Sequence, residues 1–360
     1  MYSTIDLNVN HLIVGYSNPI LGIFMKHFQL SFLIAALCLS AAFYCSGIAG
    51  VMIALILGVL EVSLSFDNAV VNASILKRMD ARWQRYFLTW GILVAVFGMR
   101  LVFPIAIVVF ATGIDFVSVA QMALHDPLTY SMHLTASHVQ IAAFGGMFLL
   151  MVFFSFLFDN DRELHWLGYL ERKFASFGKL ESIEIIFALA VLLGMQQFVA
   201  QEERLIAITS GVAGVILYVI VGSLSALFEN EEEGEEVSTA IKRGSVMSFI
   251  YLEILDASFS FDGVIGAFAI TQDVVIIMLG LAIGAMFVRS LTVYLVRQGT
   301  LDEYVFLEHG AHYAIGALAG IMLASMEYDI PEVVTGLIGA TFIGLSVISS
   351  ILYKRKHATV

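Results

Sequence analysis

Two similar segments of the chain place acidic and hydroxyl side chains at the same spacing within apolar surroundings. In Glu61–Ala73 an acidic residue is followed at the second, fourth and sixth positions by Ser, Ser and Asp, and Asp256–Phe268 repeats this order. The matched residues are Glu61, Ser63, Ser65 and Asp67 in the first copy and Asp256, Ser258, Ser260 and Asp262 in the second. Carboxylate and hydroxyl oxygens are hard ligands, so the two copies predict a site for a hard cation.

The other donors near these motifs narrow the choice of ion. Two amides, Asn68 and Asn72, follow the first motif, and the sequence contains no CxxC or HExxH pattern that would indicate a zinc site. An oxygen donor set favours Mn²⁺, Mg²⁺ or Ca²⁺ over Zn²⁺ or Cu⁺. We expect Asp67 and Asp262 to be the principal metal ligands, with Glu61, Asn68 and Asp256 completing the metal set and Ser65, Asn72 and Ser260 supporting it.

Two arginines lie in equally apolar stretches and bear on the charge of this site. Each ionised side chain in a membrane interior costs about 3 kcal/mol, so Arg100 and Arg289 are expected to pair with the acids. Two arginines cannot neutralise the four acids Glu61, Asp67, Asp256 and Asp262, and the remaining negative charge suits a divalent cation. The alternative is that these acids only fix helix packing through salt bridges, such as Asp67 with Arg100 and Asp262 with Arg289.

Two further self-matches show that the motifs belong to a longer internal repeat. The matched segments are Gly91–Arg100 with Gly280–Arg289, and Ser137–Phe148 with Ala311–Met322. In the first match, Gly and Arg are nine residues apart in both copies, so each arginine is expected to act as a counter-charge to the motif of its own repeat. The second match aligns His138 with His312, which we expect to be interfacial caps or ion gates.

The spacing of the first motif also predicts its local geometry. On a regular helix at about 100° per residue, Glu61, Ser65, Asn68 and Asn72 form one stripe, while Asp67 points about 120° away from it. Either the two acids serve different faces or the helix is broken near the Ser-Phe-Asp sequence. We favour a break.

The elements that position these residues follow from the composition. Of 360 residues, 59% are hydrophobic and 13% charged, against about 25% charged in soluble proteins, and the mean hydropathy is +0.90. This excludes a soluble globular protein, and the lack of long alternating segments argues against a membrane β-barrel. A net charge of −12 provides no basic surface for nucleic acid. The fold class predicted is an all-α polytopic membrane protein, with the lipid bilayer as its surroundings.

About ten membrane helices are predicted from runs of about 20 apolar residues. They begin near Phe28, Val51, Phe87, Ile141, Ile183, Leu205, Ser245, Val274, Ala311 and Pro331. We expect the first run to be a retained span rather than a removed signal. With both termini cytoplasmic, 15 of the 18 Lys and Arg residues lie inside, as the positive-inside rule requires. The acidic run at 229–236 is then expected to be a solvated cytosolic loop.

These spans organise the repeats within a single membrane domain covering residues 1–360. The first three-helix repeat is predicted at 51–158 and the second at 245–327, with intervening helices at 183–228 and a last helix at 331–353. Five crossings separate the second predicted span from the seventh, and an odd number reverses the direction of the chain. Inverted repeats commonly form a substrate site near the membrane midplane, so the sequence predicts a transporter.

At the motifs, the sequence resembles the TerC/Alx-type integral membrane proteins of the LysE-like transporter superfamily, in particular a bacterial branch of unassigned function. The segment EVSLSFDN, from Glu61 to Asn68, is similar to that family's acid-x-x-Leu-Ser-x-Asp-Asn signature, and the second copy lies around Asp262. In the second copy Gly263 replaces the expected Asn. The resemblance covers roughly Ile48 to Tyr353 and implies that Glu61, Asp67, Asn68 and Asp262 belong to a metal path.

The resemblance implies export of a divalent cation, Mn²⁺ first, across a bacterial inner membrane, with the ion as transported substrate and with no enzyme activity or cofactor. A homo-oligomer or a stress-protein partner is compatible with it. The first alternative is a non-transporting scaffold of a metal or tellurite stress-resistance system. Two others are an intramembrane hydrolase that uses Asp67 and Asp262 as a dyad and an exporter of amino acids.

The predicted topology can be tested with reporter fusions. A reporter at Met122 should be external, because the loop from Thr112 to Val139 has no Lys or Arg, and a reporter after Lys356 should be cytoplasmic. A cytoplasmic signal at Met122, or an external one after Lys356, would contradict the ten-span topology and the inverted repeat with it.

Overall fold

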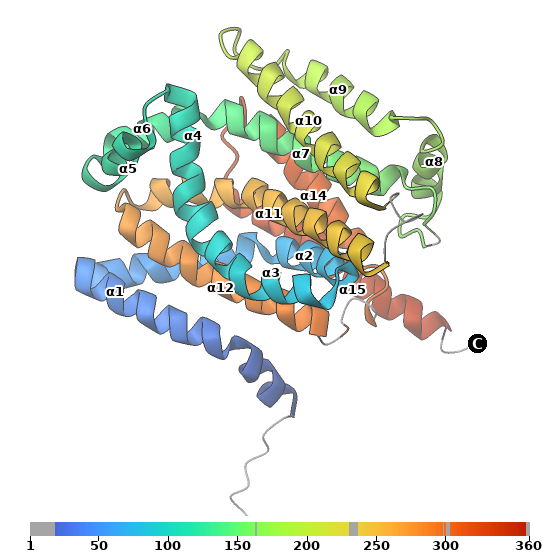
Figure 1. Cartoon of the computed structure of the whole chain (residues 1–360), viewed down its shortest axis with the longest axis horizontal. Helices are drawn as coiled ribbons and strands as arrows, with labels where there is room; N and C mark the ends of the chain where they lie inside the picture. Colours follow the sequence, from blue (N-terminus) through green and yellow to red (C-terminus); the bar gives the residue numbers. More distant parts are fainter. Residues whose placement is uncertain (1–18, 163, 230–236, 298, 300–302, 358–360) are drawn as a thin grey trace, which may run out of the picture.

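The computed structural model is built from helices (Figure 1). It describes residues 19–162, 164–229, 237–297, 299 and 303–357. No strand is found among these residues, and the prediction of an all-α membrane fold is confirmed. Within the described part of the chain, five helices are long and apolar enough to cross a membrane, namely Phe28–Leu64, His138–Phe158, Arg204–Ser223, Val274–Arg297 and Val334–His357.

The helices follow the predicted spans closely. Their bounds are α1 Pro19–Leu64, α2 Phe66–Arg78, α3 Ala81–Leu93, the π-helix η2 Val94–Val102, α4 Phe103–Thr112, α5 Phe116–His125, α6 Pro127–Ala136, α7 His138–Phe158, α8 Tyr169–Phe177, α9 Ile183–Met195, α10 Arg204–Glu229, α11 Val237–Ile270, α12 Val274–Arg297, α14 Leu307–Ala324 and α15 Glu332–His357. A helix lies at each of the ten predicted positions. The number of crossings and the inverted relation of the repeats stay predictions.

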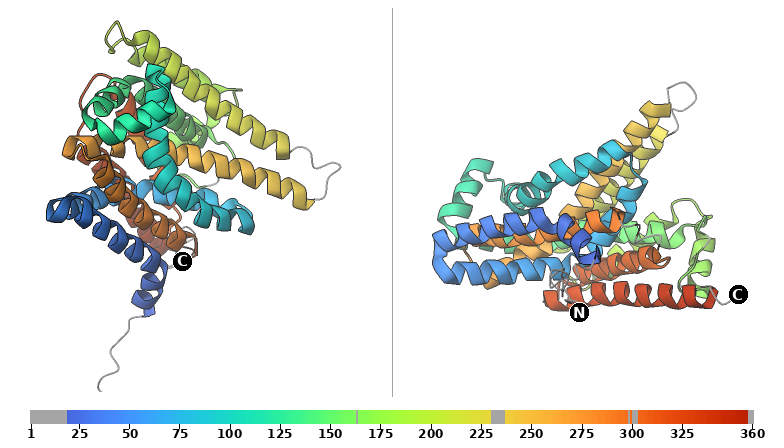
Figure 2. Two further views of the ribbon diagram at one scale, coloured as in Figure 1. Left: turned by 60° about the vertical axis from the view of Figure 1, so that its left-hand side comes forward. Right: turned by 90° about the horizontal axis from the view of Figure 1, so that it is seen from below.

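Helix α1 contains the first two predicted spans, joined by a sharp turn. Ser46 and Gly47 have non-helical dihedral angles, and Gly47 has a φ of 61°, a left-handed value that glycine adopts without steric conflict. Because of this turn the two halves of α1 run back along each other (Figure 2). The second half leads directly into the first motif.

Glycines allow the second half of α1 to cross α12 closely. A Cβ atom on Gly280 would lie 2.7 Å from Cβ of Leu57 and 3.0 Å from the carbonyl oxygen of Ala54. A Cβ atom on Gly58 would lie 3.1 Å from Cγ2 of Ile283. Small residues at such crossings let helix backbones approach in membranes. The crossing holds the helix of the first motif against the helix that carries Arg289.

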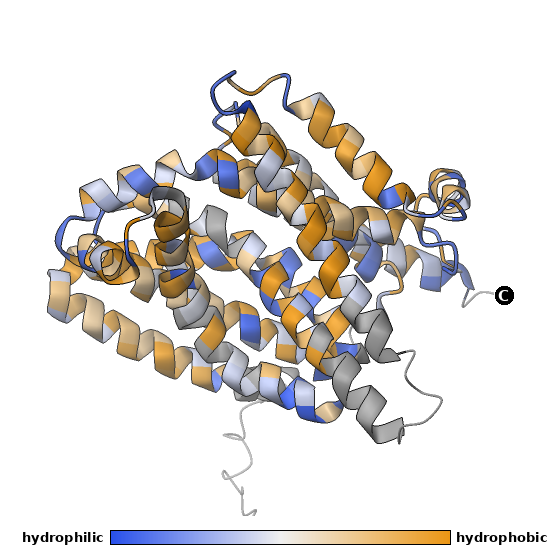
Figure 3. Cartoon of the chain, turned by 45° about the horizontal axis from the view of Figure 1, so that its top comes forward, coloured by the Kyte–Doolittle hydropathy of each residue, from blue (hydrophilic) through white to orange (hydrophobic). Residues whose placement is uncertain are grey.

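Helix α7 forms the centre of the largest apolar cluster. Its residues Met147, Phe148 and Leu149 are fully buried and pack with residues of α10 and α14. Figure 3 shows apolar residues along α1, α9 and α10, and side chains such as Leu37 and Ile186 on these helices are exposed. Exposed apolar side chains on the outer helices are what a lipid-facing surface requires.

The short helices α5 and α6 lie at one end of the bundle (Figure 1). Asp115 and Asp126 cap them by accepting hydrogen bonds from the backbone N–H groups of Ser118 at 3.0 Å and Thr129 at 3.3 Å. The hydrogen bonds from Ser118 hold the pKa of Asp115 below its ordinary value. The C terminus lies at the opposite end of the bundle (Figure 1); the sides of the membrane on which the two ends lie stay a prediction.

Candidate cation site

The helix of the first motif is interrupted near the Ser-Phe-Asp sequence, where the residue spacing predicts a break. Helix α1 ends at Leu64 and α2 begins at Phe66, and between them Ser65 has φ −100° and ψ 18°, away from regular helical values of about −63° and −42°. The N–H of Ser65 still donates to the carbonyl of Glu61 at 2.9 Å. The N–H of Asn68 instead donates to Oδ1 of Asp67 at 3.0 Å, so a side chain replaces a carbonyl of the helix ladder.

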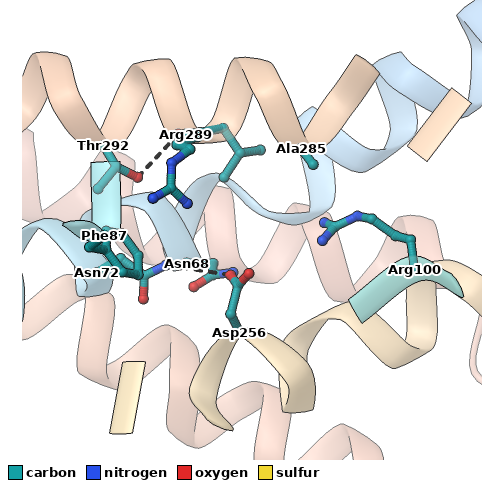
Figure 4. A pocket seen from close by; sticks show the side chains of 9 residues that line it. Asn68, Asn72, Phe87, Arg100, Asp256, Ala285, Arg289 and Thr292 are labelled. Carbon is teal, nitrogen blue, oxygen red and sulfur yellow. Dashed lines mark hydrogen bonds between the residues drawn. The ribbon is translucent and has the colours of Figure 1, made fainter. Parts of the chain in front are cut away.

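A small polar cavity lies beside the break (Figure 4). Its volume is about 20 Å³ and its lining residues are Asn68, Asn72, Phe87, Arg100, Asp256, Ala285, Val288, Arg289 and Thr292. These residues come from α2, α3, η2, α11 and α12, so the cavity lies where both motif helices meet both arginine helices. A volume of this size holds one water-sized group.

The carboxylate of Asp256 links the two motifs across the cavity. Its Oδ1 accepts hydrogen bonds from Nδ2 of Asn68 at 2.7 Å and from Nδ2 of Asn72 at 3.5 Å (Figure 4). The amide oxygens of both asparagines are buried and have no hydrogen-bond partner. An unsatisfied buried acceptor costs about 1–3 kcal/mol. Two such oxygens beside a carboxylate are suited to bind a cation.

Arg100 pairs with Glu61. Nη2 of Arg100 donates to Oε1 of Glu61, and the two side chains are 4% and 2% exposed. Oγ of Ser65 also donates to this carboxylate at 3.2 Å. Arg100 lies on η2, a π-helical segment, and such segments are rare and often found at functional sites. The acid that pairs with Arg100 belongs to the motif of the same repeat, as expected, but it is Glu61 and not Asp67, the partner named as an example under the salt-bridge alternative.

Asp67 lies on the other side of α2. Its carboxylate is buried but does not line the cavity, and it faces α15, where a Cβ atom on Gly339 would lie 3.1 Å from its Oδ2. The predicted divergence of Asp67 from the stripe is thus present in the structure. The hypothesis that Asp67 is a principal ligand requires a rotation about the break at Ser65.

Arg289 and Glu253 complete the charged groups of the site. The guanidinium of Arg289 is buried and stacks over the ring of Phe87, 4.4 Å from its centroid. Its Nε and Nη2 atoms, and Oε1 of Glu253, are buried without hydrogen-bond partners. Glu253 is not among the site residues predicted from the sequence. Its spacing of three residues from Asp256, which puts both acids on one helix face, was the available signal.

Several predicted site residues lie elsewhere. The side chains of Ser260 and Asp262 lie outside the described residues, as do 230–236 of the acidic run. Neither His138, which begins α7, nor His312, within α14, lines the small cavity. His312 stacks on Phe156 at 4.0 Å and lines a separate cavity of about 420 Å³. Because neither histidine lines the small polar cavity, the structure offers no contact that would support either as a gate of the cation site.

The charge at the site is negative. By formal charge, the four described acids in and around the site, Glu61, Asp67, Glu253 and Asp256, exceed Arg100 and Arg289 by two. No group of three or more His, Cys, Asp and Glu side chains able to hold a metal is found in the described part of the chain. The donors gathered here are one carboxylate and two amides, a set typical of weak, exchangeable binding rather than of a structural metal centre.

Comparison with known proteins places the chain in a family. Residues 66–357 match the family described as "Protein of unknown function (DUF475)". The chain belongs to this family. The matched region includes every residue that lines the small cavity, so the cavity lies within the part of the chain that defines the family.

A relative of the chain is named as a membrane protein. Over 136 residues the chain is 28% identical to the "Uncharacterized membrane protein YceF" of Bacillus subtilis (strain 168). The match covers 35% of this chain and 52% of the relative, so the chain spans about half the length of that protein. No solved structure matches the chain. The chain is therefore a membrane protein of a family whose function is not assigned, and the TerC/Alx resemblance stays a prediction.

The buried pair predicts a specific stability effect. Glu61→Gln removes the charged partner of Arg100, and loss of one member of a buried ion pair costs about 3–5 kcal/mol. Unfolding of the purified protein in detergent should show this loss, and the double variant Glu61→Gln with Arg100→Gln should recover most of it. The control is Glu303→Gln, because Glu303 and Lys354 are exposed and 4.0 Å apart, which is worth at most about 1 kcal/mol. A Glu61→Gln variant as stable as the parent would contradict this role for the pair.

Proposed function

We propose that the chain is a membrane transporter that exports a divalent cation, with Mn²⁺ as the preferred ion. The observation that carries the proposal is the pair of buried amide oxygens on Asn68 and Asn72 that have no hydrogen-bond partner beside the carboxylate of Asp256. The two amides belong to the first motif and the carboxylate to the second, and Asn68 and Asp256 are 188 positions apart in sequence. Oxygen donors of this kind suit Mn²⁺, Mg²⁺ and Ca²⁺.

The size and charge of the cavity support an ion as substrate. A volume of about 20 Å³ accommodates a water-sized group and is too small for an amino acid. The two excess negative charges favour a divalent cation over any anion. Water or backbone carbonyls would complete the coordination sphere. A transported ion must also leave its site, which a partial ligand set permits.

The positions of the two arginines also support the proposal, because the acids can then be neutralised by a guanidinium or by a metal ion. Arg100 neutralises Glu61, while Arg289 lies within electrostatic range of Asp256 and Glu253. When no metal ion is bound, these guanidinium groups lower the cost of burying carboxylates in the bundle. A cation that binds at Asp256 takes over part of this role. Helices α2 and α11 run in opposite directions in Figure 1, and inverted halves are what alternating access around one site requires.

The proposal predicts a ranking of two isosteric variants. Asp256→Asn keeps the shape of the cavity and removes a charge-assisted ligand, so cells under excess Mn²⁺ should accumulate several-fold more manganese than cells with the parent protein. Asp67→Asn should have the smaller effect, because Asp67 does not line the cavity. The measurement is cellular metal content by mass spectrometry at matched protein levels, with each of Mn²⁺, Mg²⁺ and Ca²⁺ in excess.

Glu327→Gln is the control, because Glu327 is exposed and lies outside the cavity. Unchanged metal content for Asp256→Asn, with the variant present in the membrane at the parent level, would contradict a cation site at this cavity. It would then favour a scaffold that does not transport metal.

A further inference from the structure

Arg289 faces two carboxylates and is bonded to neither. Glu253 and Asp256 lie one turn apart on α11, and both interact electrostatically with the guanidinium. Nε and Nη2 of Arg289 have no hydrogen-bond partner, although both are buried. A buried guanidinium whose hydrogen-bonding groups are unused is costly. The guanidinium therefore lies near two acids and uses neither of them as a hydrogen-bond acceptor.

The carboxylate of Glu253 has a hydrogen-bond acceptor without a donor. Its Oε1 is buried and makes no hydrogen bond, and Arg289 is the cation that interacts with it. A buried carboxylate with an unused acceptor atom is stabilised when it accepts a hydrogen bond from a guanidinium. The unused donors of Arg289 and the unused acceptor of Glu253 are therefore complementary.

Gly91 leaves open the space between these two groups. A Cβ atom at this position would lie 2.7 Å from Nη2 of Arg289 and 3.1 Å from Oε1 of Glu253, and the first distance is shorter than any unstrained contact. The two charged groups thus both approach the bare backbone of α3 at Gly91. The ring of Phe87, one turn earlier on α3, stacks against the guanidinium. A residue larger than glycine at position 91 would obstruct the approach.

The first repeat lacks this second acid. The position three residues before Glu61 is Gly58, whereas the position three residues before Asp256 is Glu253. Gly58 is used in the close crossing with α12, and Arg100 is already bonded to Glu61. The two arginines therefore differ: one has a fixed partner, and the other has two partners within reach.

We propose that Arg289 alternates between Asp256 and Glu253, and that Glu253 is the positioning residue that receives it when a cation binds at Asp256. This inference rests on the proposed function, because it takes Asp256 as the cation ligand. Without the ion, the guanidinium neutralises Asp256. With the ion, it moves across Gly91 to Glu253, so that the cation does not face an adjacent positive charge. Glu253 acts through Arg289 and not as a ligand.

The test is a double-mutant cycle on the full-length protein purified in detergent, with Mn²⁺ binding measured by calorimetry. Glu253→Gln should weaken binding by at least tenfold, because Arg289 then has no second partner and repels the ion. Arg289→Gln should strengthen binding. In the Arg289→Gln background, Glu253→Gln should change affinity by less than twofold, because the group that Glu253 receives is gone.

A glycine pair provides the matched steric control. Gly91→Ala should weaken binding about as much as Glu253→Gln, whereas Gly98→Ala should leave it unchanged, because a Cβ atom on Gly98 would meet only Val94 at an ordinary 3.4 Å. Equal losses for Glu253→Gln in both backgrounds would show a direct action on the cation and overturn the inference. Parent-like binding by both Glu253→Gln and Gly91→Ala would also overturn it. A parent protein that binds no Mn²⁺ would instead overturn the proposed function.

Discussion

The structure depends on keeping ionised side chains inside an apolar helical bundle. A carboxylate or guanidinium there is tolerated only with a counter-charge and hydrogen bonds. The Glu61–Arg100 pair meets this condition with two buried partners and a hydroxyl from Ser65. Asp256 meets it with two asparagine amides. Arg289 and Glu253 meet it only in part, and these unsatisfied atoms are the basis of the proposed movement of Arg289.

Departures from regular helix accompany these charges. The break at Ser65 turns Asn68 and Asn72 towards Asp256 while Asp67 faces α15. The π-helical turns of η2 carry Arg100 to Glu61. Glycines at the crossing of α1 with α12 and at position 91 let backbones approach where side chains would separate them. Each irregularity therefore serves the placement of a charged group.

Periodicity and spacing in the sequence were sufficient for part of the site. The stripe of Glu61, Ser65, Asn68 and Asn72 and the break near Ser65 follow from about 100° per residue, and three of these four residues contact the site's acids. The alignment of Arg100 with Arg289 indicated two counter-charges. The all-α membrane class follows from composition, because 59% hydrophobic and 13% charged residues depart strongly from the about 25% charged residues of soluble domains.

The rest depends on contacts between helices, which one sequence does not encode locally. The partner of Arg100 depends on the wider i→i+5 turns of η2, which shift the direction of the side chain relative to a regular α-helix. Glu253 can come close to Arg289 because Gly91, on a different helix, has no side chain between them. The position of Asp67 depends on how far α2 rotates after the break.

The central claim is that the cavity between the two motifs carries a divalent cation across the membrane. The most direct test is Mn²⁺ flux into liposomes that contain only the purified full-length chain, followed with an enclosed metal-sensitive dye. The account predicts Mn²⁺ entry well above that of protein-free liposomes, and entry near the protein-free rate for liposomes with Asp256→Asn at equal protein content. Mn²⁺ entry at the protein-free rate with the parent protein, under every imposed ion gradient, would contradict it.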